Sequence, residues 1–374
     1  MKIGLVLDDT LDTPDGVQQY VLNVGAWLST QGHDVHYLVG ATTRTDIPNI
    51  HSLSRNMHVR FNGNRMSMPL PADRLKLRAF LAGMQFDVLH VQVPYSPFMA
   101  GRLLSVTPKT TAVVGTFHIL PYSKLVILAN RLLGIMNRRS GKRFDHMMAV
   151  SAPARIFARE AYGYDSAVVP NPVNLSQFQG AVSDSATTNI VFLGRLVERK
   201  GSLLLLQAVA YMHEHGLADD AFRVVIGGKG ELLAELQSFA AAHRLTDIVE
   251  FPGFVDEAAK GAFLAQADIA VYPSTGGESF GIVLLEGFAA ARGAVVAGNN
   301  PGYASVMQPY PDQLVDPTDV VAFAEKLAWY LNHPMGRARA AELQRQYVQH
   351  FDIGVVGNEL LTVYANALQS RRGS

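Results

Sequence analysis

The feature that most limits the fold is an alternation of short apolar runs with helical patterns, which occurs twice along the 374-residue chain. The apolar runs are mostly continuous, and continuous Val/Ile/Leu runs are typical of parallel strands that are covered on both faces. Strands that alternate with helices predict a doubly wound α/β sheet. In the first series, strands are expected at 2–7, 35–39, 86–91, 111–117, 147–150 and 167–169, and helices at 17–31, 72–84, 124–139 and 153–162.

A polar stretch divides the two series. Residues 171–188 start with Asn171-Pro172 and lack a long periodic pattern, which indicates a linker. We therefore predict one Rossmann-like domain over 1–170, a second over 189–350, and a C-terminal helix over 351–374 that returns to the first domain. Two such domains are expected to face each other across a cleft, with ligands at the carboxyl ends of the strands.

The second series has the same character as the first. Strands are expected at 190–193, 222–226, 248–251, 269–272, 293–297 and 313–315. Helices are expected at 202–215, 231–243, 257–266, 283–291 and 318–331, and the tail over 337–368 is expected to be helical.

Composition excludes several classes of protein. The chain has no cysteine, which excludes disulfide scaffolds, zinc ribbons, iron–sulfur clusters and thiol nucleophiles. No apolar run reaches eighteen residues, and Asp8 and Asp9 come too early for a secretory leader. The expected location is therefore the cytoplasm.

The net charge of zero hides an asymmetry. Residues 1–170 carry 18 Lys/Arg against 11 Asp/Glu, whereas residues 171–374 carry 14 against 21. A sign difference of this kind suggests an anionic partner for the first half, although a solvated basic helix face would give the same balance. Nucleic acid is not expected, because the cations are not interleaved with stacking aromatic residues.

The basic character is concentrated in one segment. Residues 122–144 combine apolar residues at helical spacing with six cations and no acid. Such a helix can lie in a membrane interface, where its cations meet anionic lipid, and it can equally be a Rossmann helix with one buried face. We expect the interfacial role, on the inner face of the cell membrane. The six cations are Lys124, Arg131, Arg138, Arg139, Lys142 and Arg143.

Two loops carry candidates for binding phosphate. Gly16 follows the first expected strand and opens a helix, where backbone N–H groups can approach a phosphate, although a lone glycine there is often only a turn. Arg195 and Lys200 lie in the loop GRLVERKG after the first strand of the second series, and two such cations can clamp a diphosphate. The chain lacks G-x-G-x-x-G, which disfavours a nicotinamide cofactor.

The strongest motif is STGGESFGIVLLE at 274–286. It places Glu278 in a Gly-rich loop after an expected strand, and Glu286 eight positions later on the following helix. An acid in such a loop can bind sugar hydroxyls, and one on the helix can hold the ribose diol of a nucleotide.

These motifs resemble those of the retaining GT-B glycosyltransferases of family four. The resemblance rests on GRLVERKG, GGKGE at 227–231, STGGESFGIVLLEG and GTFH at 115–118, and it extends along the whole chain. Within that family, DGVQQYV, FNG at 61–63 and FDVLHVQVPYSP are most similar to the phosphatidylinositol alpha-mannosyltransferases. The fold implied is two facing Rossmann-like domains with a C-terminal helical tail.

The resemblance also implies roles for individual residues. His118 and Gly16 would contact the donor sugar and its diphosphate, and Asn62 would contact the acceptor. Arg195 and Lys200 would neutralise the leaving nucleoside diphosphate, Glu278 would bind sugar hydroxyls, and Glu286 would bind the ribose. The other nucleotide-sugar contacts implied are Lys260, Ser279, Phe280, Gly281 and Ile282. No cofactor is required, and any stimulation by a divalent metal would involve no protein site, since the chain has no D-x-D.

The activity expected is hexose transfer with retention, from GDP-mannose to a membrane lipid such as phosphatidylinositol. Glucosyl or galactosyl transfer from a UDP-sugar to diacylglycerol or another acceptor is the first alternative. A nucleotide-sugar epimerase, a glycoside hydrolase that uses Glu278 and Glu286, and a non-catalytic binding module also remain open.

Overall fold

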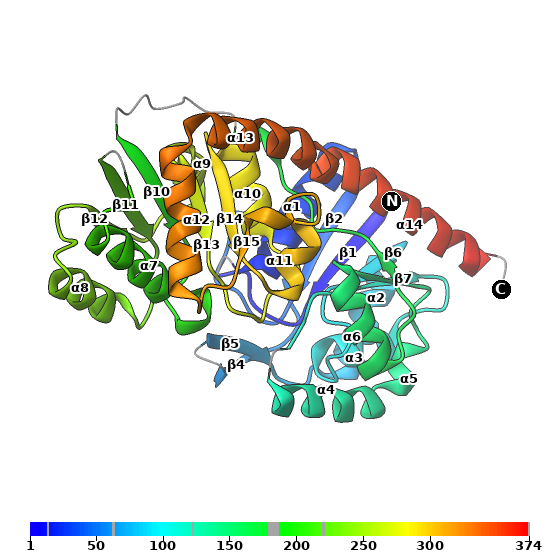
Figure 1. Cartoon of the computed structure of the whole chain (residues 1–374). Helices are drawn as coiled ribbons and strands as arrows, with labels where there is room; N and C mark the ends of the chain where they lie inside the picture. Colours follow the sequence, from blue (N-terminus) through cyan, green and yellow to red (C-terminus); the bar gives the residue numbers. More distant parts are fainter. Residues whose placement is uncertain (13–14, 62–63, 122, 179–186, 219–220, 373–374) are drawn as a thin grey trace. The chain divides into compact units, whose positions relative to one another are not determined.

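The computed structural model describes residues 1–12, 15–61, 64–121, 123–178, 187–218 and 221–372 (Figure 1). The backbone alone is described at 58–61 and 64–68 and at Met136, Arg138, Arg139 and Arg372. The chain forms two compact units. Unit 1 comprises Met1–Pro172 and Ile353–Ser374, and unit 2 comprises Val173–Asp352.

Unit 1 is built on a parallel sheet of seven strands in the order β3-β2-β1-β6-β7-β8-β9. Alternate residues of the central strand β1 (Lys2–Leu7) enter different cores, as expected for a strand covered on both faces. Ile3, Leu5 and Leu7 pack into one core, and Val6 packs into the other. The other strands are β2 (Asp34–Val39), β3 (Ile50–Ser52), β6 (Val88–Val91), β7 (Ala112–Phe117), β8 (His146–Ala149) and β9 (Ala167–Val168).

Helices cover both faces of this sheet. Helices α1 (Gly16–Thr30) and α14 (Ile353–Arg372) contribute to one core, and α2 (Arg74–Met84) and α3 (Met99–Val106) contribute to the other. Tyr364 of α14 is fully buried, and its hydroxyl lies 2.7 Å from Nδ1 of His90. Near the end of α14, Arg371 Nε lies 2.6 Å from Asp145 Oδ1. The remaining helices are α4 (Lys124–Met136), α5 (Arg138–Gly141) and α6 (Ala152–Tyr162).

Unit 2 has a parallel sheet of six strands in the order β12-β11-β10-β13-β14-β15. The strands are β10 (Thr188–Leu193), β11 (Phe222–Gly227), β12 (Val249–Gly253), β13 (Ile269–Tyr272), β14 (Ala294–Gly298) and β15 (Leu314–Val315). The helices are α7 (Ser202–Glu214), α8 (Leu233–Ala242), α9 (Glu257–Ala265), α10 (Ile282–Ala290), α11 (Pro301–Val306), α12 (Val320–Asn332) and α13 (Pro334–Val348). The expected doubly wound parallel α/β architecture is confirmed in both units.

Two expected helices are interrupted. The tail predicted as helical over 337–368 is two helices, because α13 ends at Val348 and a 3-10 turn over Gln349–Phe351 leads to Asp352 in an extended conformation. There the backbone carbonyl of Phe351 accepts from Val173 N at 2.9 Å, so this segment pairs with an earlier one. The helix predicted over 124–139 ends at Met136, since Asn137 leaves the helical conformation and its amide donates to the carbonyl of Tyr95.

Five elements were not predicted, namely β3, α3, α11 and the two strands of an antiparallel hairpin, β4 (Asn56–Phe61) and β5 (Asn64–Pro69). The hairpin had a sequence signal, because Asn-Gly between two strands favours a tight turn. Within the described ranges, no helix has the length and apolar character needed to cross a bilayer.

A buried carboxylate fixes the start of α3. Asp8, directly after β1, accepts from Ala100 N at 2.7 Å and from the hydroxyl of Ser96. Burial raises the pKa of Asp8 to about 6, although the two hydrogen bonds oppose this shift. A raised carboxyl pKa means that the folded state holds a proton which the unfolded state has lost, so this contribution to stability disappears as the pH rises through about 6.

We expect Asp8→Asn to reduce the pH dependence of the stability of unit 1. Between pH 5 and 8 the wild-type carboxyl loses about 1.4 kcal/mol of stabilisation, because the pKa of the folded protein lies inside that interval. Urea unfolding would be followed by Trp27 fluorescence in a Trp329→Phe background, since Trp27 is in unit 1 and Trp329 in unit 2. The same pH dependence in Asp8→Asn and its parent would contradict the assignment.

Candidate functional site

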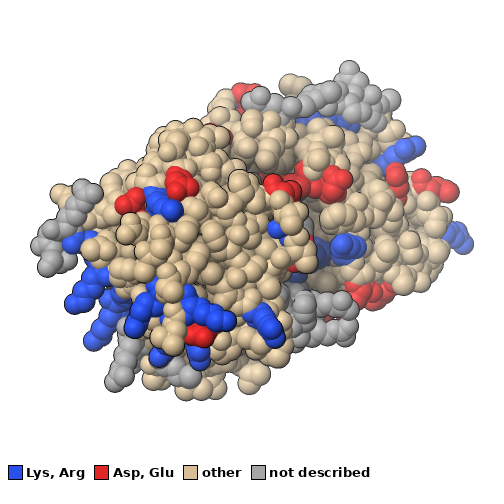
Figure 2. Space-filling view, turned by 180° about the vertical axis from the view of Figure 1, so that it is seen from behind, with Lys and Arg blue, Asp and Glu red and all other residues tan. Residues whose placement is uncertain are grey.

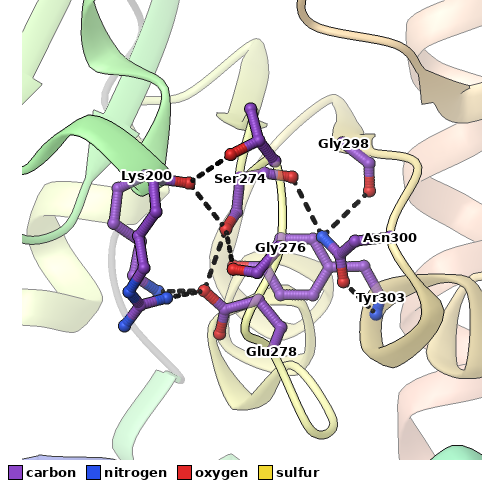
Figure 3. Close-up of polar contacts among 9 residues, drawn as sticks. Lys200, Ser274, Gly276, Glu278, Gly298, Asn300 and Tyr303 are labelled. Carbon is purple, nitrogen blue, oxygen red and sulfur yellow. Dashed lines mark hydrogen bonds and ion pairs between the residues drawn. The ribbon is translucent and has the colours of Figure 1, made fainter. Parts of the chain in front are cut away.

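The best-defined polar cluster of unit 2 surrounds Glu278 (Figure 3). Oε1 of Glu278 lies 2.7 Å from Nη1 of Arg199 and 2.8 Å from Nζ of Lys200. The hydroxyl of Ser274 lies 2.9 Å from the same oxygen. Among the described residues, no hydrogen bond reaches Oε2 of Glu278, so that oxygen is available to accept from a ligand.

The local backbone explains why these three side chains meet. A short 3-10 turn, Glu198–Lys200, carries both cations and ends at Gly201, whose φ is +74°. A Cβ at Gly201 would lie 2.1 Å from the carbonyl oxygen of Pro273, so only glycine lets the cationic turn approach the loop after β13. Thr275 N also donates to the Arg199 carbonyl at 2.9 Å, which joins the two loops directly.

Asn300 supports the loop from a second direction. Its amide nitrogen donates to the Ser274 carbonyl at 3.0 Å, and its Oδ1 accepts from Tyr303 N at 3.0 Å at the start of α11 (Figure 3). The Asn300 side chain therefore connects the loop that carries Glu278 to the segment after β14. Gly302 lies close to the same loop, because a Cβ there would be 2.0 Å from the Glu278 carbonyl oxygen.

Electrostatics keeps Glu278 ionised. Burial acts to raise the pKa of its carboxyl, but the adjacent Lys200 and Arg199 hold that pKa below its ordinary value. Burial lowers the pKa of the Lys200 ammonium, an effect that Glu278 opposes and that the neighbouring Arg199 and Arg195 reinforce. The cluster is therefore a half-buried carboxylate between cations.

Glu286 and Lys260 form a second ion pair. Lys260 Nζ on α9 lies 2.7 Å from Oε1 of Glu286 on α10 and 2.8 Å from Oε2 of Glu257. Burial raises the pKa of the Glu286 carboxyl, and Lys260 offsets only part of that shift. Burial acts to lower the pKa of Lys260, but the two carboxylates raise it above its ordinary value. The structure thus brings together Lys260 and Glu286, which the sequence indicates as two separate nucleotide-sugar contacts.

The other candidates of unit 2 lie on the same loop and helix. Gly281, with φ of +131°, is the N-cap of α10, and Ile282 is its first residue. Phe280 is buried against Phe351, with ring centroids 6.0 Å apart, so its side chain belongs to the core. Ser279 and Arg195 are partly exposed.

Unit 1 holds the remaining candidates. His118 follows β7 and is almost completely buried, and its Nε2 lies 2.9 Å from Oε1 of Gln92. Burial lowers the pKa of His118 to about 3, so its imidazole is neutral near pH 7. Gly16 is the exposed first residue of α1. Asn62 lies outside the described residues.

Helix α4 presents an apolar stripe to solvent. Four residues at helical spacing are between 58% and 78% exposed, namely Leu125, Leu128, Leu132 and Ile135. The opposite side of the helix packs against α6, because Gly134 lets the two backbones approach closely at Ala161. Lys124, Arg131 and Lys142 are exposed, and Figure 2 shows Lys and Arg gathered at the lower left of the face that it presents.

Arg143 does not fit the expectation of a membrane-facing cation. Its Nη2 donates to the carbonyls of Pro108 and Thr111, each at 2.8 Å, and only 16% of its side chain is exposed. This arginine instead holds the loop before β7. The side chains of Arg138 and Arg139 lie outside the described residues.

Comparison with known proteins identifies the family. Residues 14–177 match the model described as Glycosyltransferase Family 4, and residues 176–347 match the one described as Glycosyl transferases group 1. A phosphatidyl-myo-inositol mannosyltransferase of Mycobacterium tuberculosis (strain H37Rv) is 31% identical, over 97% of this chain and 96% of the relative. The phosphatidyl-myo-inositol mannosyltransferase of Mycobacterium leprae is 30% identical, over 99% of this chain and 98% of the relative. The chain belongs to family 4 of the glycosyltransferases and is of the phosphatidyl-myo-inositol mannosyltransferase type.

Solved structures agree with the GT-B fold of this glycosyltransferase. A Rickettsia africae glycosyltransferase has a TM-score of 0.74 at 18% identity and covers 98% of both chains. Sucrose-phosphate synthase from Thermosynechococcus elongatus has a TM-score of 0.75 at 18% identity, over 99% of this chain and 100% of the other. The expected GT-B fold is confirmed, and the enzyme transfers a sugar.

Several site residues of the glycosyltransferase escaped sequence reasoning. Arg199 is one of them. It stands beside Lys200 in the same motif, and a single helical turn there would have indicated that both cations can contact Glu278. Asn300 is another, and its signal was an Asn-Pro helix start directly after a strand. Gln92 had no signal beyond its position at a strand end. Among the described residues, no group of three or more His, Cys, Asp or Glu could hold a metal ion.

We expect Lys260→Met to destabilise unit 2 by about 3 kcal/mol at pH 8, because it leaves Glu286 buried without its cation. The loss should shrink at pH 5, since the pKa of Glu286 is already raised and the carboxyl will take up a proton. Adding Glu286→Gln should restore most of the stability. Urea unfolding followed by Trp329 fluorescence in a Trp27→Phe background would measure each variant.

The control for this series is Lys326→Met on α12, which should change stability by less than about 0.5 kcal/mol. A Lys260→Met variant as stable as its parent at pH 8 would show that the ion pair does not satisfy a buried charge.

Proposed function

We propose that the enzyme transfers mannose from GDP-mannose, with retention of configuration, to a phosphatidylinositol-type lipid at a membrane surface. The observation that carries this proposal is Glu278, whose side chain is 14% exposed and has one oxygen held by Arg199 and Lys200 and the other available. A carboxylate oxygen with no protein partner suits a sugar hydroxyl, and cations beside it suit a diphosphate.

In the proposed reaction, the cations beside Glu278 act on the leaving group, the nucleoside diphosphate. As the bond from the sugar to the diphosphate breaks, negative charge grows on the phosphate oxygens. Arg195, Arg199 and Lys200 stabilise that charge, and preorganised groups of this kind contribute several kcal/mol in a site that excludes water. Glu278 carries one negative charge against the two positive charges of Arg199 and Lys200, so this cluster keeps one excess positive charge for the phosphate.

Glu286 is assigned to the ribose of the donor. Its carboxylate lies on α10, directly after the loop of Glu278, and Lys260 and Glu257 extend the polar surface beside it. Ser279, Gly281 and Ile282 would contribute backbone groups to the nucleotide sugar. Gly16 and His118 of unit 1 are assigned to the donor diphosphate and sugar on the family resemblance, and Asn62 to the acceptor.

Retention is proposed to follow a front-face course, in which a departing phosphate oxygen takes the proton of the acceptor hydroxyl. The names of relatives support an inositol-containing acceptor. Besides the mannosyltransferases, a Salinispora tropica protein named D-inositol 3-phosphate glycosyltransferase is 26% identical over 96% of this chain. Transfer from a UDP-sugar to diacylglycerol is the alternative.

We expect release of nucleoside diphosphate from GDP-mannose only when phosphatidylinositol is present, with an α-linked product by NMR. UDP-glucose and UDP-galactose, each with phosphatidylinositol or diacylglycerol, complete the screen. Glu278→Gln should lower turnover at least about 10²-fold while diphosphate binding persists, whereas Glu286→Gln should mainly weaken that binding.

Turnover of a UDP-sugar alone among these donors would overturn the mannosyl assignment. A nucleotide sugar converted without any acceptor would indicate an epimerase. Full activity of Glu278→Gln, with an unchanged melting temperature, would remove that residue from the reaction.

We propose in addition that α4 binds the anionic lipid surface on the inner side of the cell membrane. The stripe of Leu125, Leu128, Leu132 and Ile135 would enter the headgroup boundary, and Lys124, Arg131 and Lys142 would meet anionic lipid. Each such cation contributes about 1 kcal/mol near an anionic surface. The exposed apolar residues of α4, with exposed cations on it and at Lys142 beyond α5, support this proposal.

The double variant Lys124→Glu/Arg131→Glu should bind vesicles of phosphatidylglycerol and phosphatidylcholine at least tenfold more weakly than wild type. Arg223→Glu/Arg339→Glu, which reverses two exposed cations of unit 2, is the matched control and should bind normally. Binding should also weaken between 0.1 M and 1 M salt, because the Debye length falls from about 10 Å to about 3 Å. Co-sedimentation that is equal for neutral and anionic vesicles would contradict the proposal.

A further inference from the structure

His118 belongs to a ladder of buried polar side chains at the carboxyl ends of β6 and β7. The two strands are parallel, with His90 opposite Val114 and Val91 opposite Gly115. This register gives two hydrogen bonds with the same separation of 26 residues, one between His90 and Thr116 and one between Gln92 and His118. Gln92 is 0% exposed, so both ends of its amide need protein partners.

The partners of Gln92 determine which way its amide points. Nε2 of Gln92 donates to the carbonyl oxygen of His90 at 3.5 Å, and Oε1 lies 2.9 Å from Nε2 of His118. Rotating the amide by 180° would place its oxygen against the His90 carbonyl oxygen, where two acceptors repel. The oxygen therefore points to His118, and since it can only accept, Nε2 of His118 carries the hydrogen.

His90 is itself held at both ring nitrogens. Nδ1 lies 2.7 Å from the hydroxyl of Tyr364 on α14, and Nε2 lies 2.7 Å from Oγ1 of Thr116. The carbonyl that orients Gln92 thus belongs to a residue anchored by the C-terminal helix.

The surroundings of His118 keep it neutral. The titratable groups that face it are Tyr20 of α1, with ring centroids 5.0 Å apart, and His90 of β6, with Tyr364 of α14 behind His90. Within the described ranges, no carboxylate or cation makes an ion pair or hydrogen bond with His118. His118 is 7% exposed, and no described residue makes a hydrogen bond with its Nδ1.

We propose that Gln92 is a positioning residue, which holds His118 as the Nε2–H tautomer so that Nδ1 accepts a hydrogen bond from a hydroxyl of the transferred sugar. The identity of that hydroxyl group rests on the proposed function, whereas the tautomer does not. A fixed lone pair at Nδ1 selects a hydroxyl donor and orients the sugar ring.

The tautomer is tested without substrate. In protein labelled with ¹⁵N at histidine, His118 is identified as the resonance absent from His118→Gln. We expect Nε2 protonated and Nδ1 unprotonated from pH 5 to 8. A wild-type protein with hydrogen on Nδ1 in that range would overturn the proposal, whatever the donor screen finds.

Gln92→Glu tests the link to activity. A carboxylate at this place stabilises the imidazolium of His118 and so raises its pKa, and a protonated carboxyl group donates to Nε2 and moves the hydrogen to Nδ1. In both cases Nδ1 loses its lone pair at low pH. We expect a new acid limb in kcat, about tenfold per pH unit, together with a matching ¹⁵N transition, neither of which wild type shows between pH 5 and 8.

Two further variants complete the test. Gln92→Met removes the amide without adding a charge, and it should lower kcat about tenfold with less than threefold change in donor KM and in diphosphate affinity. Gln344→Glu places a carboxylate at a fully buried glutamine of unit 2 and should give no acid limb. Unchanged kcat in Gln92→Met, or a folded Gln92→Glu without the acid limb, would overturn the proposal.

Discussion

Parallel strands bring all their carboxyl ends to one edge of a sheet, and both units place their chemistry there. In unit 1, Asp8, Gln92 and His118 come directly after β1, β6 and β7. In unit 2, Ser274 and Asn300 follow β13 and β14 within two residues. Register therefore decides which side chains meet, as the equal separations of His90–Thr116 and Gln92–His118 show.

Charge is distributed unevenly between the two ion-pair clusters of unit 2. Arg199, Lys200 and Glu278 together carry one excess positive charge, whereas Lys260 with Glu257 and Glu286 carries one excess negative charge. Burial favours the protonated form of a carboxylate, and each cluster opposes this by supplying cations within 3 Å. The positive cluster suits phosphate, and the negative one suits hydroxyl groups that donate hydrogen bonds.

Much of the fold could be predicted from the sequence, because buried parallel strands are continuous apolar runs. β1 and β13 have the bounds expected from the apolar runs. The breaks at Asn137 and Asp352 could not be predicted, since each depends on a hydrogen bond to a segment far along the chain. The motifs also indicated Glu278 and Lys200, but not Gln92, whose contact with His118 arises from the pairing of two strands. Arg143 shows the opposite error, because charge counting cannot separate a solvated cation from one that binds backbone carbonyls.

Unit 2 is inserted within unit 1, because the chain leaves unit 1 at Pro172 and returns at Ile353. This order has a consequence for synthesis on the ribosome. All of unit 2 has been made before α14 emerges, whereas the core of unit 1 still lacks Ile353, Val356, Leu360, Tyr364 and Ala367. Until α14 emerges, the nascent N-terminal sheet exposes the apolar residues that α14 covers, and His90 lacks the hydroxyl of Tyr364. Helix α14 thus completes the core of the part of the chain that is made first.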